Sequence, residues 1–158
     1  MSEKVTLFME STKKDPEQTI AEIQLLLKKF GVRDVLINYN EQGEAEALSF
    51  TIQHGDVKIP FRLPVNHRPI WELAKRGKTK YIKDELQARR VAWRQIYRWI
   101  QAQIALIETQ MVTVEEVFLP YMLLKDNKTV YKAFLESGFK GYLPGGDTKR
   151  ELQEKEED

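Results

Sequence analysis

The amino-acid sequence predicts an α+β fold: a small antiparallel sheet packed on one face by helices, with one long central helix. Three observations predict this class. Apolar residues alternate with polar ones between residues 32 and 65, they recur at helical spacing from about residue 83 to about residue 111, and a well-capped helix precedes both segments. With 158 residues, 42% of them hydrophobic, the chain can build one real core. We expect a single domain over residues 1–140 and a mobile acidic C-terminal tail over 141–158.

The N-terminal segment predicts a short strand followed by a helix. Val5 to Met9 form an apolar run that predicts the strand. Asp15 stands where a helix N-cap is expected, Pro16 suits the first helical position, and Gln18 completes a capping box. Apolar residues then recur at helical spacing at Ile20, Ile23, Leu27 and Phe30. Gly31 follows them and marks the end of the helix.

Residues 32 to 65 predict antiparallel strands, because the hydrophobic period changes to two. The turn sequences EQGE and HGD divide this segment into three runs. The alternating apolar residues are Val35, Ile37 and Tyr39, then Leu48, Phe50 and Ile52, and finally Val57, Ile59, Phe61 and Leu63. Pro60 lacks a backbone donor, so the third strand is expected at an edge. One face of this sheet is expected to be exposed to solvent, and helices must cover the other face.

Helices are expected through the second half of the chain. A short one is predicted around Ile70 to Lys75, and a long one runs from about residue 83 to about residue 111. The long helix carries a broad apolar stripe, which places it in the core: Trp93, Tyr97, Ile100, Ile104, Ile107 and Met111. Thr113, followed three residues later by a glutamate, begins another helix that Pro120 should end. Val130 to Ser137 predict the last helix.

The formal net charge of +1 conceals an uneven distribution. Residues 66–99 carry 10 Lys and Arg against 3 Asp and Glu, whereas residues 147–158 carry 3 against 6. A concentration of cations on one segment favours a negatively charged partner. The acidic end of the chain could compete with such a partner for the basic surface, recruit another protein, or serve as a solubilising tail.

Three arginines of the long helix fall on one face. Arg90, Arg94 and Arg98 are spaced by four residues, and their Cα atoms span roughly 12 Å. No acid lies between Glu85 and Glu108, so these arginines lack the intrahelical partners that usually accompany a solvated face. Either an anionic ligand or acids elsewhere in the fold must compensate them. The acids considered for this role are Glu41, Glu44 and Glu46.

The segment before the long helix adds a basic loop with interleaved aromatic residues. Cations beside exposed rings are typical of single-strand binders, because the charges follow the phosphate backbone while a ring stacks on any base. We therefore predict a non-enzymatic nucleic-acid-binding protein whose most favoured ligand is single-stranded DNA. The candidate interface comprises Arg68, Trp71, Lys75, Arg76, Lys78, Lys80, Tyr81, Arg90, Arg94 and Arg98.

Several other classes find little support in the sequence. The chain has no cysteine, and its two histidines, His54 and His67, have no metal-site spacing, so no metal and no cofactor are predicted. No Gly-rich phosphate loop or serine elbow is present. The wet face of the sheet lacks an aromatic pair for stacking RNA bases. Neither a membrane span nor a secretory signal is recognisable, which favours a cytoplasmic protein.

The sequence resembles a family of small proteins encoded by tailed bacteriophages and prophages. The resemblance rests on "ARRVAWRQIYRWIQAQIALIETQM" and "EEVFLPYMLL", preceded by "PEQTIAEIQLLLKKFG" and "FRLPV". It runs from about Ser11 to Phe134 and is most specific at Ala92 to Arg94 and at Phe118 to Tyr121. It implies a viral protein that acts in the cytoplasm of the host bacterium during DNA replication, recombination or takeover of the host. It implies no catalytic residues.

The main alternative is a protein–protein interaction module, such as an inhibitor of a host bacterial protein. It would use the same basic surface, or the segment from Phe118 to Leu124 if that segment is exposed. An enzyme would require carboxylates that only the fold brings together. The long helix is apolar on two sides, which also leaves room for a homodimer.

Overall fold

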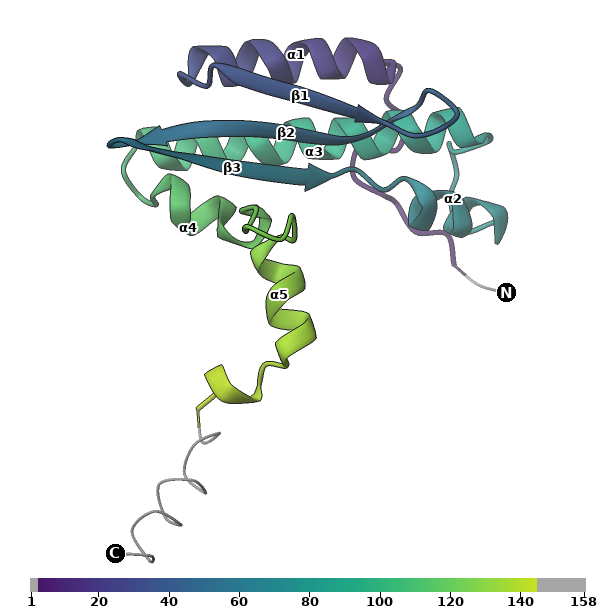
Figure 1. Ribbon diagram of the computed structural model, residues 1–158. Helices are drawn as coiled ribbons and strands as arrows, with labels where there is room; N and C mark the ends of the chain where they lie inside the picture. The colour runs from purple at the N-terminus through teal and green to yellow at the C-terminus, as the bar shows by residue number, and fades with distance from the viewer. Residues whose placement is uncertain (1–2, 145–158) are drawn as a thin grey trace, which may run out of the picture.

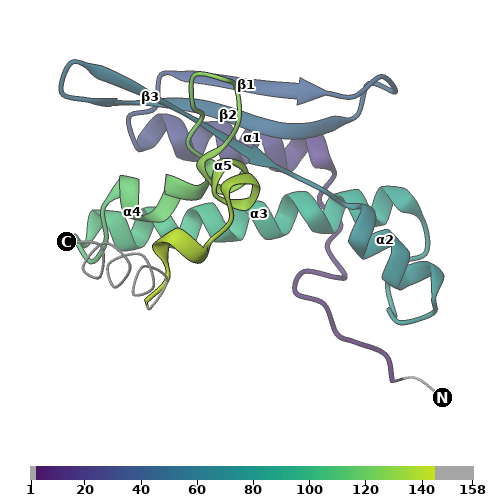
Figure 2. The same ribbon diagram turned by 60° about the horizontal axis from the view of Figure 1, so that its bottom comes forward.

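The computed structural model describes residues 3–144 and has the predicted α+β architecture (Figure 1). A three-stranded antiparallel sheet in the order β1-β2-β3 is covered on one face by α1 and α3 (Figure 2). The strands are β1 (Asp34–Tyr39), β2 (Ala45–His54) and β3 (Val57–Pro64). The helices are α1 (Pro16–Lys29), α2 (Arg68–Lys75), α3 (Glu85–Glu108), α4 (Val114–Phe118) and α5 (Val130–Ser137), with short 3-10 helices η1 (Leu119–Tyr121) and η2 (Lys140–Tyr142). The predicted acidic tail falls largely outside the described residues.

The predicted N-terminal strand is wrong. Residues 3–14 form an irregular segment that crosses the α2–α3 loop, and Val5 donates its backbone N–H to the carbonyl of Lys78 at 2.7 Å. Met9 adopts a positive φ of 66° within a turn in which Glu10 donates its backbone N–H to the carbonyl of Leu7 at 3.1 Å. The apolar run therefore lies beside the α2–α3 loop and not beside a strand. A loop cannot form the backbone hydrogen-bond ladder that a β-strand requires.

Helix α1 begins and ends as predicted. The backbone N–H of Asp15 donates to the side-chain oxygen of Gln18 at 3.0 Å, and Gly31 terminates the helix with φ +96°. The apolar face of α1 is buried against the sheet and α3: Ile20, Ile23 and Leu27. Burying each of these side chains contributes about 1.5–3 kcal/mol relative to leaving it in water.

The strands are antiparallel as predicted, and β3 lies at an edge of the sheet as predicted. Phe50 of β2 lies opposite Val35 of β1 and Phe61 of β3, so most of the alternating apolar residues share one buried face. Tyr39 and Val57 are exceptions, because they lie at strand ends and are 61% and 58% exposed. Pro60 lies on the outer strand, and its carbonyl accepts the backbone N–H of Leu123 at 2.9 Å. The segment after η1 thus covers the β3 edge at the position where the strand has no donor to offer.

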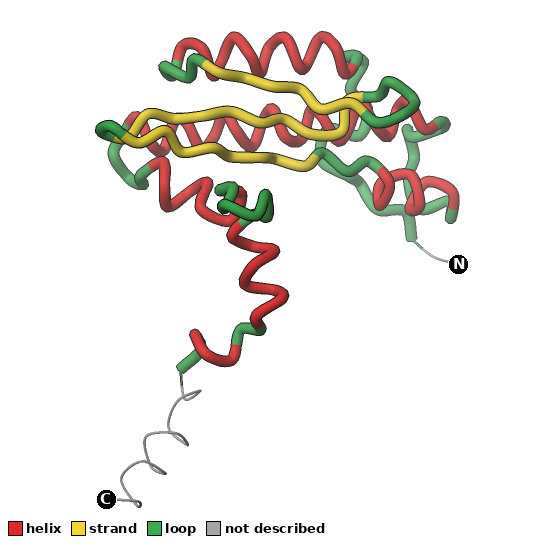
Figure 3. The backbone as a smooth tube through the Cα atoms, viewed as in Figure 1, coloured by secondary structure: helices red, strands yellow, loops and turns green. Residues whose placement is uncertain are grey.

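Helix α3 crosses behind the sheet and supplies much of the core (Figure 3). Its buried side chains include Trp93, Ile100 and Ile104. The helix ends at Glu108, and Met111 lies beyond it with 70% of its surface exposed, so the predicted apolar stripe is too long by one turn. Phe118 completes the core from α4, with its ring centroid 5.4 Å from that of Phe50.

Candidate nucleic-acid interface

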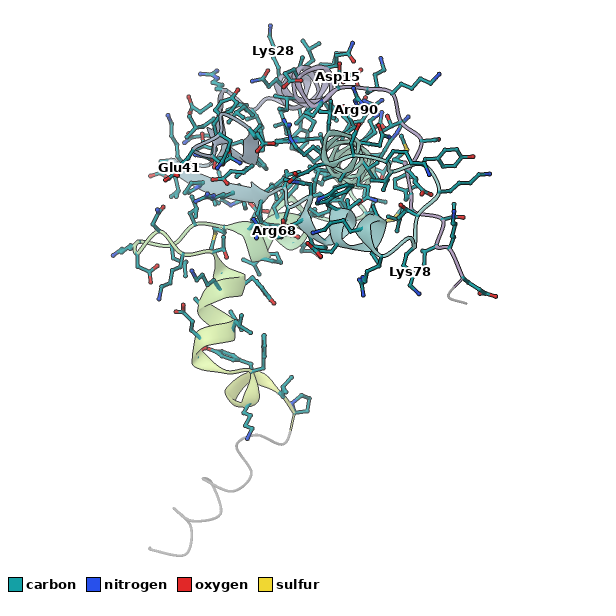
Figure 4. All side chains as sticks on the ribbon, turned by 90° about the vertical axis from the view of Figure 1, so that its right-hand side faces the viewer. Asp15, Lys28, Glu41, Arg68, Lys78 and Arg90 are labelled. Carbon is teal, nitrogen blue, oxygen red and sulfur yellow. The ribbon has the colours of Figure 1, made fainter. Side chains whose placement is uncertain are left out.

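Most of the arginines of α3 are held by carboxylates of the fold. The Nε of Arg90 lies 2.7 Å from Asp15 Oδ1 at the start of α1, and Arg94 is paired with Glu22 two turns later on the same helix. Figure 4 shows Asp15 and Arg90 together between these two helices. The preceding arginine, Arg89, contacts a carboxylate oxygen of Glu44 at 3.0 Å.

The Arg94 pair is the most deeply buried of these. Only 7% of the Arg94 surface is exposed, and its guanidinium also lies 4.4 Å from the centroid of the Tyr97 ring. The hydrogen bond from Arg94 holds the pKa of Glu22 below its ordinary value of 4.5, against the opposing effect of desolvation. Arg94 therefore joins α3 to α1 and is buried between them.

The hypothesis of an unneutralised arginine stripe is thus corrected for two of its three residues. Compensation by acids of the fold, one of the two alternatives, accounts for Arg90 and Arg94, although the acids come from α1 and not from the β1–β2 turn. Arg98 differs, since it is exposed and donates to the side chain of Gln101 at 2.9 Å. Within residues 3–144 no carboxylate lies within ion-pair distance of Arg98.

The loop between α2 and α3 retains its positive charge. We define the basic loop as residues 75–83, which contain five cations and no acid: Lys75, Arg76, Lys78, Lys80 and Lys83. Lys75 pairs with Glu72 at 2.8 Å. No ion pair within the described chain involves the other four. Because only one of the five cations forms an ion pair within the described chain, most of the charge of the basic loop is not neutralised by a paired carboxylate.

Glu72 lies among three cations of α2. Its hydrogen bond with Lys75 lowers its pKa, and the charges of Arg76 and Arg68 act in the same direction. These three cations follow one exposed face of the helix, because they are separated by seven and eight residues. Arg68 and Lys78 lie toward opposite ends of α2 at the same end of the domain (Figure 4). The basic loop is therefore continuous with a basic face of α2.

The two predicted stacking residues have different environments. Tyr81 is 49% exposed, and the Nζ of Lys80 lies 5.3 Å from the centroid of its ring. Trp71 is half-buried and packs against a small second core that includes Ile82 and Val91. Tyr81 thus remains a stacking candidate, whereas Trp71 mainly holds α2 on α3.

A buried carboxylate from the N-terminal segment fixes the backbone of the basic loop. Glu10 is 4% exposed, and its Oε1 accepts the backbone N–H groups of Lys80 at 2.7 Å and Tyr81 at 3.1 Å. Gln87 of α3 donates to the carbonyls of Glu10 and Thr12 at 3.0 and 2.9 Å. These bonds fix the base of the Tyr81 side chain before any ligand arrives.

A hollow of about 420 Å³ lies beside the Tyr81 ring. Its lining residues are Ser11, Thr12, Lys13, Tyr81, Gln87 and Arg90. Lys13 is exposed at its rim, so the hollow combines an aromatic wall with a cation outside the basic loop. Lys13 was not predicted from the sequence, because it lies 68 positions before Tyr81 and only the crossing of the N-terminal segment brings the two together.

The apolar segment proposed for a protein partner is mostly covered. Phe118 is 1% exposed, and only Leu119 and Leu124, at 46% and 38%, present large apolar surface there.

The two histidines form contacts between different parts of the fold. His54 at the end of β2 contacts Glu115 of α4 at 2.7 Å, and His67 before α2 contacts Glu85 of α3 at 2.9 Å.

The described part of the chain has neither a grouped metal-ligand set nor a membrane-spanning helix. Among residues 3–144 no three His, Asp or Glu side chains are grouped as metal ligands. No helix in that range has the length and apolar character needed to cross a membrane.

Comparison with protein-family models, curated proteins and solved structures yields no match. The function is therefore inferred from the residues and geometry of this chain.

Proposed function

We propose that this chain is a non-enzymatic nucleic-acid-binding protein that prefers single-stranded DNA and binds it on the basic loop and the adjoining hollow. One observation carries the proposal. Nine residues contain five cations and an exposed tyrosine, and the buried carboxylate that contacts the backbone of that tyrosine, Glu10, is already occupied by backbone donors. Positive charge and an open aromatic face are the two elements of single-strand recognition.

A base stacked on Tyr81 would occupy the hollow, and its flanking phosphates would lie between Lys13 and Lys80. The volume of about 420 Å³ is in the range of pockets that hold small ligands. Stacking on one aromatic side chain contributes about 1–3 kcal/mol per base, with little preference among bases. Each phosphate contact adds affinity that falls as salt rises.

The preference for single strands follows from the aromatic wall. In a duplex the faces of the bases are stacked on one another, so a duplex could use the cations but not the ring of Tyr81. The resemblance to proteins of tailed phages supports a role in phage DNA replication or recombination in the host cytoplasm. Arg90 lines the hollow but is engaged by Asp15, and Arg94 is buried, so neither is assigned a phosphate.

Fluorescence anisotropy with matched single- and double-stranded oligonucleotides tests this proposal. If about four phosphates are neutralised, single-strand affinity falls about 50-fold between about 50 mM and about 200 mM salt. The double variant Arg76→Ala/Lys80→Ala should weaken binding at low salt and reduce the salt slope. The matched control, Lys28→Ala/Lys29→Ala, removes two exposed lysines from α1 and should leave binding close to that of the unaltered chain. Equal losses in both variants would refute a defined site.

An acidic segment of a host or phage protein is the alternative ligand for the same cations. Tyr81 distinguishes the two, because a peptide carboxylate needs the charges and a base also needs the ring. Tyr81→Ala should lower single-strand affinity about 5- to 150-fold, and Tyr81→Phe should restore most of it. Binding of an acidic peptide that survives Tyr81→Ala, with no affinity for oligonucleotides, would favour the protein ligand.

A further inference from the structure

The C-terminal arm, residues 130–144, contacts η1 at its root and extends away from the sheet (Figure 1). Figures 1 and 3 show α5 and η2 extending beyond the β3 side of the sheet. None of the α5 residues is buried. The arm instead exposes five large apolar side chains: Tyr131 at 56%, Leu135 at 54%, Phe139 at 43%, Tyr142 at 67% and Leu143 at 58%. An eight-residue helix is marginal in water by itself, so this surface needs a cover.

The arm nevertheless has a defined shape. The ring of Phe134 lies 4.6 Å from that of Tyr142 and 6.5 Å from that of Phe139, measured between centroids. Thr129 caps α5 by accepting the backbone N–H of Lys132 at 3.2 Å. These contacts leave Tyr131 and Leu135, four residues apart, on the same outward face.

The root of the arm fixes its direction. Val130 donates its backbone N–H to the carbonyl of Met122 at 2.9 Å, and Leu123 pairs with Thr129. Met122 in turn pairs with Phe61 of β3. The root of the arm is therefore tied to the sheet edge, and α5 points away from the sheet (Figure 1).

The outer face of the sheet offers a matching surface. Leu36 projects from β1 on this side with 60% of its surface exposed. It lines a shallow hollow of about 380 Å³, in which Pro60 and Leu123 are further apolar walls. The polar part of the lining comprises Ser49, Thr51, Arg33 and Asp34. The hollow lies next to the root of the arm, and the arm of the same chain leaves it open.

We propose that two copies of the chain exchange arms, each arm covering the outer-face hollow of the other copy. The three exposed aromatic residues of one arm, Tyr131, Phe139 and Tyr142, expose on the order of 300 Å², taking about 150–250 Å² for a whole aromatic side chain. Two arms and two receiving faces then bury roughly 1,200 Å² before the leucines are counted, which reaches the size of a stable interface. The contact is isologous, since each copy provides both surfaces.

Light scattering coupled to size-exclusion chromatography tests the exchange at about 50 µM, in the range where a micromolar dimer is populated. The full chain, nuclease-treated and in high salt, should elute at twice the monomer mass of 18.6 kDa. Leu135→Glu on the arm and Leu36→Glu on the receiving face should each raise the dimer Kd by about 30-fold or more. The control Leu25→Glu changes an equally exposed leucine of α1 and should leave the dimer intact.

A mixture of the Leu135→Glu and Leu36→Glu variants should recover part of the dimer, because one arm and one face remain unaltered. A monomeric unaltered chain would overturn the proposal, and so would a Leu36→Glu variant that stays dimeric while Leu135→Glu does not. All three leucines are more than half exposed, so the fold should survive, as circular dichroism will check. If Leu135→Glu loses helicity, Tyr131→Ser replaces it as the arm variant. If Leu36→Glu loses helicity, Leu36→Ser replaces it as the variant of the receiving face. The measurement uses no nucleic acid, so its outcome is independent of the proposed binding function.

Discussion

Replacing Glu22 with glutamine tests whether the arginines of α3 serve the fold. Breaking a fully buried ion pair costs about 3–5 kcal/mol, whereas an exposed pair contributes about 0.2–1 kcal/mol. The Arg94 side chain is 9% exposed and that of Glu22 is 31% exposed, which places this pair between the two cases. We expect a loss of about 2 kcal/mol, or about 4–8 °C in Tm for a chain of this size.

The pH dependence of the effect provides a second readout. The pKa of Glu22 is lowered in the folded protein, so the pair stabilises the fold fully above the ordinary carboxyl value of 4.5. This stabilisation is lost as the pH falls through the folded pKa. The Tm difference between the unaltered chain and Glu22→Gln should therefore be largest at neutral pH and shrink below pH 4.5.

Thermal melts followed by circular dichroism measure both effects, with Glu17→Gln as the control on the exposed side of α1. A Glu22→Gln variant that melts within about 1 °C of the unaltered chain would refute the structural role, since the expected loss is several degrees. Arg94→Gln gives an independent check. If it lowered DNA affinity more than Arg76→Ala/Lys80→Ala without lowering Tm, the arginine would serve the ligand.

Three further changes probe the basic loop, the core and the junction of α2 with α3. Glu10→Gln replaces a buried acceptor of backbone N–H groups with a side chain that also carries donors, so it should cost about 1–3 kcal/mol. Faster amide hydrogen exchange in residues 75–83 would reveal it, and unchanged exchange would contradict the role given to Glu10. Phe118→Ala removes a ring that is 1% exposed and should cost about 3–5 kcal/mol by urea unfolding; a loss below about 1 kcal/mol would show that the site repacks. The hydrogen bond from His67 lowers the pKa of Glu85, so this contact stabilises the fold above pH 4.5 and is lost as the pH falls through the folded value. Glu85→Gln should accordingly reduce Tm at neutral pH and leave it unchanged at acidic pH. An equal reduction of Tm at the two pH values would exclude an ionic contact between His67 and Glu85.

The elements that the sequence predicts well are those defined by local chemistry. The alternation around Phe50, the capping residues of α1 and α4, and the edge position of Pro60 each depend on neighbours a few residues away. Val5 to Met9 have a composition typical of a β-strand, yet they do not form one. Composition does not specify a partner, and the segment meets a loop and a carboxylate instead of a strand.

The candidate site was harder to predict because its decisive contacts are distant in sequence. The spacing of Arg90 and Arg94 shows correctly that α3 has no acids for them, but the i,i+4 rule concerns a single helix. Their partners lie 75 and 72 positions earlier, on α1. Asp15 and Glu22 are seven residues apart and therefore share a face of α1, which is the pattern in the sequence that could have indicated the pairing.

The attachment of the N-terminal segment to residues 78–87 has a consequence for biosynthesis. The hydrogen bonds of Glu10 to the loop and of Gln87 to the segment join positions 70 to 77 apart. Residues 10–12 are synthesised before residues 80–87, so they cannot dock until the start of α3 has been made. The basic loop is therefore completed late, and a deletion within residues 5–13 would alter it although the two segments are about 70 residues apart in the sequence.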